Sequence, residues 1–147
     1  CQAVQLADDS LMLNCRTESP TKFRTIAVTR DLGRTWTPHA TNRMGIIEPN
    51  CNGSLYRFDY REGGKSKSVL LFANPHSQKS RTNQSIQVSF DEGKTWPAKH
   101  RLLLDEGRGK GYPSLSRVDD RHVGIVYEGS GAHLVFERIP IEDLVKR

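Results

Sequence analysis

The chain has 147 residues, enough for one ordinary domain with a core. Its composition, 35% hydrophobic and 27% charged, is that of a globular protein, and no apolar run approaches the roughly 20 residues that span a bilayer. The net charge of +5 is spread thinly, with 10 basic against 7 acidic residues in 1–73 and 12 against 10 in 74–147. Nucleic-acid binding is therefore disfavoured, whereas a modest positive field suits a small anionic substrate.

The cysteines and histidines argue against a zinc site. Cys1, Cys15 and Cys51 have no C-x-x-C spacing, and the five histidines have no H-x-x-x-H pairing. A disulfide between Cys15 and Cys51 stays open beside the alternative of small buried thiols. The chain starts at Cys1 without a methionine or a signal peptide, which suggests an excised piece of a longer protein.

Short runs of apolar or alternating residues recur along the chain with turn signals between them. They are rich in β-branched and aromatic side chains, which favours strands over helices. In chain order these runs are 11–15, 25–29, 54–58, 68–72, 85–90, 101–104, 114–116, 123–127 and 134–137. Only 140–145 is typical of a helix, because it opens on a proline and has early carboxylates. The predicted class is all-β with a short C-terminal helix.

An internal repeat organises the chain. Residues 29–36 (TRDLGRTW) match residues 89–96 (SFDEGKTW) in the pattern S/T-x-D-x-G-K/R-T-W, and each copy directly follows an alternating strand. The pattern predicts a hairpin turn, in which the aspartate hydrogen-bonds its own backbone two residues on and glycine supplies a positive φ. We expect the tryptophan to be buried beside its own turn, in preference to stacking on a sugar.

A repeat of this length, holding about four strands, fits the blades of a β-propeller. The octapeptides resemble Asp boxes, which are turn motifs of sialidases and of other propellers. The resemblance implies that each box joins the outer strands of a blade, away from the active site. The whole chain resembles the C-terminal half of exo-α-sialidases, on segments 11–16, 70–81, 111–115 and 123–128. The resemblance implies a propeller that is six-bladed in the intact protein. Residues 1–147 then form roughly its last three blades, with no independent domain boundary inside.

The same resemblance implies four site residues. Arg16 and Arg81 match the second and third arginines of the family's triad, whose guanidinium groups bind the substrate carboxylate. Tyr112 matches the nucleophile, although Pro113 replaces the usual serine after it. A tyrosine avoids the repulsion that a carboxylate nucleophile would meet from the substrate's own carboxylate. Glu128 is expected to orient the first arginine, which lies outside this chain; the alternative is an ion pair with Arg16 or Arg81.

The expected function is that of a retaining exo-α-sialidase acting on terminal sialic acids of glycoproteins, glycolipids or oligosaccharides. The resemblance implies no metal or organic cofactor, and it makes the N-terminal half of the same propeller a partner. That half should supply the first arginine, the general acid and the base, so this chain alone is expected to be inactive. A trans-sialidase and a non-catalytic Asp-box propeller that binds sugar or protein stay open. The substrate favours a secreted or periplasmic protein, or a lysosomal one in a eukaryote.

Overall fold

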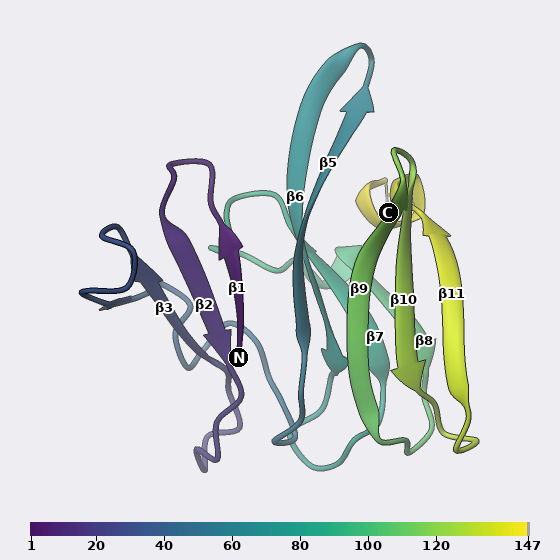
Figure 1. The fold of residues 1–147 in the computed structure, drawn as a ribbon. Coiled ribbons are helices and arrows are strands. Elements are labelled where there is room, and N and C mark those ends of the chain that lie inside the picture. Colours follow the sequence, from purple (N-terminus) through teal and green to yellow (C-terminus); the bar gives the residue numbers. More distant parts are fainter. Residues whose placement is uncertain (147) are drawn as a thin grey trace.

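The computed structural model describes residues 1–146 and consists of three antiparallel sheets that follow one another along the chain (Figure 1). The all-β prediction is confirmed, and so is the short C-terminal helix. The first sheet contains β1 (Gln2–Gln5), β2 (Leu11–Cys15), β3 (Thr25–Thr29) and β4 (Thr37–Pro38) in that order. The second contains β5 (Ser54–Glu62), β6 (Lys65–Pro75), β7 (Gln84–Ser89) and β8 (Arg101–Asp105), with a 3₁₀ turn, η1 (Ala98–His100), before β8. The third contains β9 (Gly111–Asp119), β10 (His122–Glu128) and β11 (Leu134–Pro140), which leads into α1 (Ile141–Val145).

The predicted apolar runs lie in strands, except that 85–90 extends one residue beyond β7, and the structure adds two strands that the pattern missed. β1 is mostly exposed, and β4 has only two residues, so neither carries an alternating signal. The β5–β6 hairpin extends past its predicted ends to a turn at Gly63 and Gly64, and it projects beyond the rest of the molecule in Figure 1. Its outer half is polar and pairs through the backbone ladder.

The middle sheet is buried on both faces. On one side Leu55, Leu70 and Phe72 pack against the first sheet, around Met12 and Ile26. On the other side a larger cluster joins the middle sheet to the third sheet and to α1. Its fully buried members include Phe58, Leu71, Ile86, Ile125 and Leu144. Because successive β6 residues serve opposite cores, this strand reads as the continuous apolar run 69–73.

Both repeated octapeptides form the same turn. The Asp31 carboxylate accepts the Thr35 amide at 2.8 Å and the Thr35 hydroxyl at 2.6 Å, and Asp91 repeats these bonds with Thr95. The predicted bond two residues on was therefore wrong: the carboxylate reaches four residues on, because the turn is wider than an Asx turn. The Thr35 hydroxyl and amide lower the pKa of the Asp31 carboxyl to about 2.

The two tryptophans differ, and the prediction that both are buried was wrong for one of them. Trp96 packs edge-on to Phe72, with ring centroids 6.2 Å apart, and is partly buried against the apolar cluster between the first and middle sheets. Trp36 lies over Gly33 but stays 43% exposed. It precedes the two-residue β4 at the margin of the first sheet, where no second sheet of residues 1–146 covers it.

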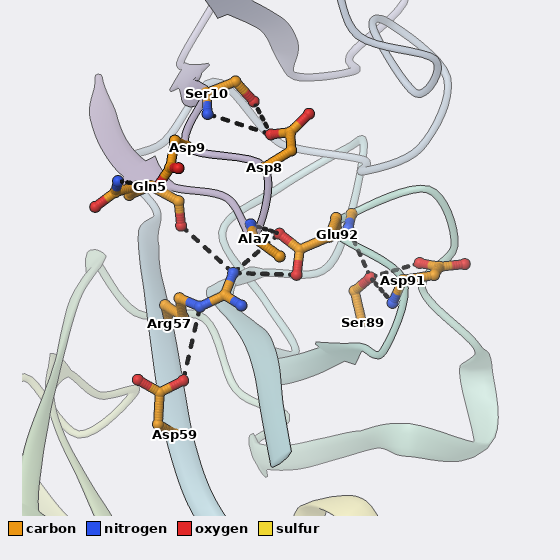
Figure 2. A network of polar contacts seen from close by, with 11 residues as sticks. Gln5, Ala7, Asp8, Asp9, Ser10, Arg57, Asp59, Ser89, Asp91 and Glu92 are labelled. Carbon is orange, nitrogen blue, oxygen red and sulfur yellow. Dashed lines mark hydrogen bonds and ion pairs between the residues drawn. The ribbon is translucent and has the colours of Figure 1, made fainter. Parts of the chain in front are cut away.

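The second octapeptide also joins the middle sheet to the first (Figure 2). Arg57 on β5 donates to both oxygens of Glu92 at 3.0 and 2.9 Å, and Glu92 accepts the Ala7 amide of the β1–β2 turn at 3.0 Å. Arg57 further contacts the Gln5 carbonyl at 3.4 Å and pairs with Asp59 at 3.6 Å. We call this set of contacts the Glu92 latch.

Candidate active site

The four predicted site residues come from all three sheets and lie where strands begin or end. Arg16 directly follows β2, Arg81 lies in the loop between β6 and β7, Tyr112 is the second residue of β9, and Glu128 ends β10. In Figure 1 the end of β2, the end of β6, the start of β9 and the end of β10 all lie at the lower end of the sheets. The fold therefore gathers residues from four sequence segments at one end.

Asn50 links the two arginines. The Arg16 Nε donates to the Asn50 Oδ1 at 2.9 Å, and the Arg81 Nη2 donates to the Asn50 carbonyl at 3.4 Å. The Arg81 Nη1 also donates to the Lys110 carbonyl at 3.3 Å. The terminal amines of Arg16 have no hydrogen-bond partner within residues 1–146, so they are free to bind an anion.

Tyr112 is held in an unusual backbone conformation beside Arg81. Its φ is 47°, and the preceding Gly111 has a φ of 79°. A positive φ is costly for a bulky residue, so the surrounding structure must hold Tyr112 in this conformation. The Arg81 guanidinium carbon lies 5.0 Å from the centre of the Tyr112 ring, and the ring is 38% exposed. The contact with Tyr112 is the main cause that raises the pKa of the Arg81 guanidinium.

Close backbone packing sets the position of the loop before Tyr112. The Gly109 amide donates to the Arg81 carbonyl at 3.0 Å. A Cβ at Gly109 would lie 2.6 Å from the Glu128 carbonyl, and one at Gly111 would lie 2.8 Å from Pro75. These glycines allow β9 to approach both the Arg81 loop and the end of β10.

Arg16 and Tyr112 line one small cleft of about 140 Å³. The other lining residues are Cys1, Gln2, Arg24, Asn52, Gly53 and Pro113. A larger cleft of about 650 Å³ lies between the second and third sheets and includes Asp59, Arg117 and Glu142. It contains none of the four predicted residues, so we place the site at the smaller cleft.

Beneath the small cleft is a buried ion pair that the motifs did not reveal. Arg24 and Glu48 are 2% and 0% exposed, with their nearest atoms 2.7 Å apart. Arg24 also donates to the Asn14 Oδ1 at 2.7 Å and to the Cys51 carbonyl at 2.8 Å. Burial lowers the pKa of Arg24, and the Glu48 carboxylate counteracts this. The available signal was a charge inside apolar sequence, as in Phe23-Arg24 and Ile46-Ile47-Glu48.

Glu128 and the cysteines complete the surroundings of the site. Glu128 forms neither a hydrogen bond nor an ion pair with any other side chain of residues 1–146, so the alternative of an ion pair with Arg16 or Arg81 is not realised. Its charge still contributes to the raised pKa of Arg81. Cys1, Cys15 and Cys51 are free thiols, and the buried Cys51 donates to the Lys110 carbonyl at 3.4 Å.

Two wider features bear on function. Within the described part of the chain, no group of three or more histidine, cysteine, aspartate and glutamate side chains is arranged to hold a metal ion. The same residues include no helix of the length and apolarity needed to cross a membrane.

Known proteins resemble this chain along most of its length. The chain is 39% identical over 145 residues to a sialidase of Bacteroides fragilis, covering 99% of this chain and 26% of that protein. It is 33% identical over 133 residues to a sialidase of Micromonospora viridifaciens, covering 88% of this chain and 20% of that one. The chain thus spans about a quarter of the length of these relatives.

Solved structures agree with this likeness. A Hadza microbial sialidase matches with a TM-score of 0.84 and 41% identity, over 92% of this chain and 26% of that one. A leech intramolecular trans-sialidase matches with a TM-score of 0.77 over 99% of this chain and 24% of its own; at 23% identity this likeness shows the fold alone. Residues 1–127 match the family described as BNR repeat-like domain. The chain therefore belongs to the BNR repeat-like domain family.

Proposed function

We propose that this chain carries the nucleophile and two carboxylate-binding arginines of a retaining exo-α-sialidase. The observation that carries the proposal is the placement of Tyr112, whose ring contacts the Arg81 guanidinium and which shares a cleft with Arg16. The relatives are named sialidases, and a sialic acid carries a carboxylate on its anomeric carbon. A tyrosine near two arginines matches that arrangement of charge.

The chemistry follows from these positions. Arg16 and Arg81 hold the substrate carboxylate, which brings the adjacent anomeric carbon towards the Tyr112 oxygen. The phenol oxygen then forms a bond to that carbon while a base takes the phenol proton. The glycosidic bond breaks, and an acid gives the leaving oxygen a proton. Water hydrolyses the tyrosyl glycoside in a second displacement, which restores Tyr112 and retains the configuration.

The remaining groups belong to the rest of the propeller in this proposal. The N-terminal half supplies the acid, the base and the first arginine, and Glu128 orients that arginine. Because Glu128 has no side-chain partner within residues 1–146, its carboxylate is available for this role. The substrates are sialylated glycoproteins, glycolipids or oligosaccharides, which favours a secreted or periplasmic protein, or a lysosomal one in a eukaryote.

The test is a substitution in the full-length protein. Tyr112→Phe should lower turnover of an aryl sialoside at least about a thousandfold, because the variant lacks the attacking oxygen. Binding of a 2,3-dehydro sialic acid analogue should change only a few-fold, since the arginines remain. Turnover is measured by release of the aryl group, and binding by calorimetry.

Tyr56→Phe is the matched control, because Tyr56 is a partly buried tyrosine on β5 that lies outside the cleft. It should keep the activity of the parent protein. Undiminished turnover in Tyr112→Phe would remove Tyr112 from the mechanism. Analysis of the products with and without an added sugar acceptor separates hydrolysis from sialyl transfer.

A further inference from the structure

The segment 48–51 lies in the connection between the first and second sheets and contacts the three segments that carry Arg16, Arg81 and Tyr112. Glu48 accepts the amide of Thr17, the residue after Arg16, at 2.8 Å. Asn50 contacts Arg16 and Arg81 directly. Cys51 donates to the carbonyl of Lys110, two residues before Tyr112. No other segment of residues 1–146 makes hydrogen bonds to all three.

Asn50 is the member of this loop that meets both guanidinium groups. Its side-chain oxygen accepts from the Arg16 Nε, and its main-chain oxygen accepts from the Arg81 Nη2. Two cations that converge on one anion repel each other until that anion binds. A neutral residue that offers a hydrogen-bond acceptor to each guanidinium group holds the two groups close together without neutralising their charge. Because Arg16 is anchored through its Nε, its two terminal amines stay available for a carboxylate.

The conformation of Asn50 fits this role. Its φ of 59° lies in the left-handed region, which asparagine tolerates better than most residues. The side-chain amide nitrogen donates to the Glu18 carboxylate at 3.4 Å, which turns the amide oxygen towards Arg16. The opposite orientation would set an N–H group against the guanidinium and an oxygen against the carboxylate. Glu18 therefore selects the useful orientation of the amide.

The buried ion pair makes the loop a firm support. Arg24 binds the Glu48 carboxylate and the Cys51 carbonyl, so both ends of the loop are attached to one buried side chain. Asn50 lies between these two attachment points. A support of this kind limits the freedom of Arg16 before substrate arrives.

We propose that Asn50 is a positioning residue that sets the separation and aim of Arg16 and Arg81 for the substrate carboxylate. This inference rests on the proposed function, because it assumes that the two arginines bind that carboxylate. Asn50 itself touches no reacting atom in the proposal. It acts through Arg16 by its side chain and through Arg81 by its main chain.

The experiment compares Asn50→Gly with the parent in the full-length protein. Glycine adopts the same φ and keeps the carbonyl that binds Arg81, but it removes the anchor of Arg16. We expect kcat/KM for an aryl sialoside to fall about ten- to a hundredfold, mainly through KM, because a misplaced contact group weakens binding and orientation. The melting temperature should stay within about 3 °C of the parent, since the change is at an accessible loop position.

A double-mutant cycle identifies the route of the effect. In an Arg16→Ala background, Asn50→Gly should add less than about a threefold loss, because its side chain acts through Arg16. Asp9→Gly is the matched control, since Asp9 also has a left-handed φ of 65° but lies in the β1–β2 turn away from the cleft. That variant should keep the kcat/KM of the parent.

The outcomes separate the inference from the function beneath it. Full loss in Arg16→Ala with parent-like kinetics in Asn50→Gly would overturn the positioning role alone. Additive losses in the double variant would overturn it as well. Parent-like activity in Arg16→Ala would instead overturn the assignment of the arginine, and the proposed function with it.

Discussion

His76 begins the loop that carries Arg81, and its imidazole is partly buried beside Arg101. The Arg101 Nη1 lies 2.6 Å from the His76 Nε2, a contact that requires the imidazole to be neutral and to accept the hydrogen bond. Burial, helped by the charge of Arg101, lowers the pKa of His76 from 6.5 to about 4. Protonation of His76 would place two cations in contact, so acid should weaken the base of the Arg81 loop.

The pH dependence of stability follows from that shift. The unfolded chain takes up a proton near pH 6.5, whereas the folded chain resists it until about pH 4. The contribution of neutral His76 to the free energy of unfolding is therefore complete above pH 6.5 and declines as the pH falls from 6.5 to 4. His76→Gln keeps a hydrogen-bond acceptor but cannot take up a proton. Between pH 6.5 and 4 its free energy of unfolding should therefore fall less steeply than that of the parent, by a slope that corresponds to at most one proton. Urea unfolding at several pH values measures this slope. His133 is exposed, so His133→Gln should keep the pH slope of the parent. Identical slopes in the two variants would show that His76 does not cause the decline.

The segments that carry the proposed site residues could be recognised in the sequence, whereas the contacts that support those residues could not. Arg16, Arg81 and Tyr112 stand beside apolar strands in recognisable segments, and the fold brings them together. Asn50 carries no such mark, because its importance depends on a left-handed φ and on partners 34 and 31 residues away. Long-range partners of a loop residue are set by tertiary packing and leave no periodic pattern.

At the scale of elements, the same distinction explains which strands were predictable. β2 alternates between buried and half-buried residues, so its side chains record the pleat. β1 instead forms through its ladder with β2, from Gln2 opposite Asn14 to Gln5 opposite Leu11. A strand that forms by pairing with its neighbour needs no apolar face, so a search for apolar periodicity does not find it.

The Glu92 latch is an element-scale device, because it attaches the turn of one sheet to the hairpin of another. Glu92→Ala removes the acceptor for Arg57, whose side chain is only 22% exposed, and for the amide of the exposed Ala7. We expect the free energy of unfolding of the full-length protein to fall by about 1–3 kcal/mol. Urea unfolding measures it.

Glu62→Ala is the comparison for this prediction. Glu62 pairs with Lys67 near the tip of the β5–β6 hairpin. Its loss should lower the free energy of unfolding less than the loss of Glu92 does, because an isolated surface ion pair contributes little. Equal losses in the two variants would mean that the latch adds nothing beyond a surface ion pair.

At the scale of the whole molecule, the two outer sheets are not equivalent to the middle one. The middle sheet has a core on each face, whereas the third sheet has its core on one face only. Its other face carries Val118, Leu134 and Phe136, which are 45%, 75% and 62% exposed. The Phe136 ring lies over Gly124 and beside Val118 on this face. An apolar surface that crosses three strands is typical of an interface.

We expect the N-terminal half of the propeller to cover this face, which predicts opposite effects of one substitution in two settings. Residues 1–147 expressed alone should aggregate, because the apolar face and the sheet edges are open. Phe136→Glu should increase the soluble yield of that fragment by removing the centre of the patch. In the full-length protein the same change should lower stability by about 3 kcal/mol or more, because it buries a charge where a ring had packed.

Leu103→Glu is the control for both settings. Leu103 is 43% exposed on β8, in the sheet whose two faces are already covered within the chain. The substitution should change neither the soluble yield of the fragment nor the stability of the full-length protein by much. Size-exclusion chromatography reports the first quantity, and thermal unfolding reports the second. A fragment that is a cooperative, soluble monomer without any substitution would show that residues 1–147 need no covering partner, and the assignment of this face would fall.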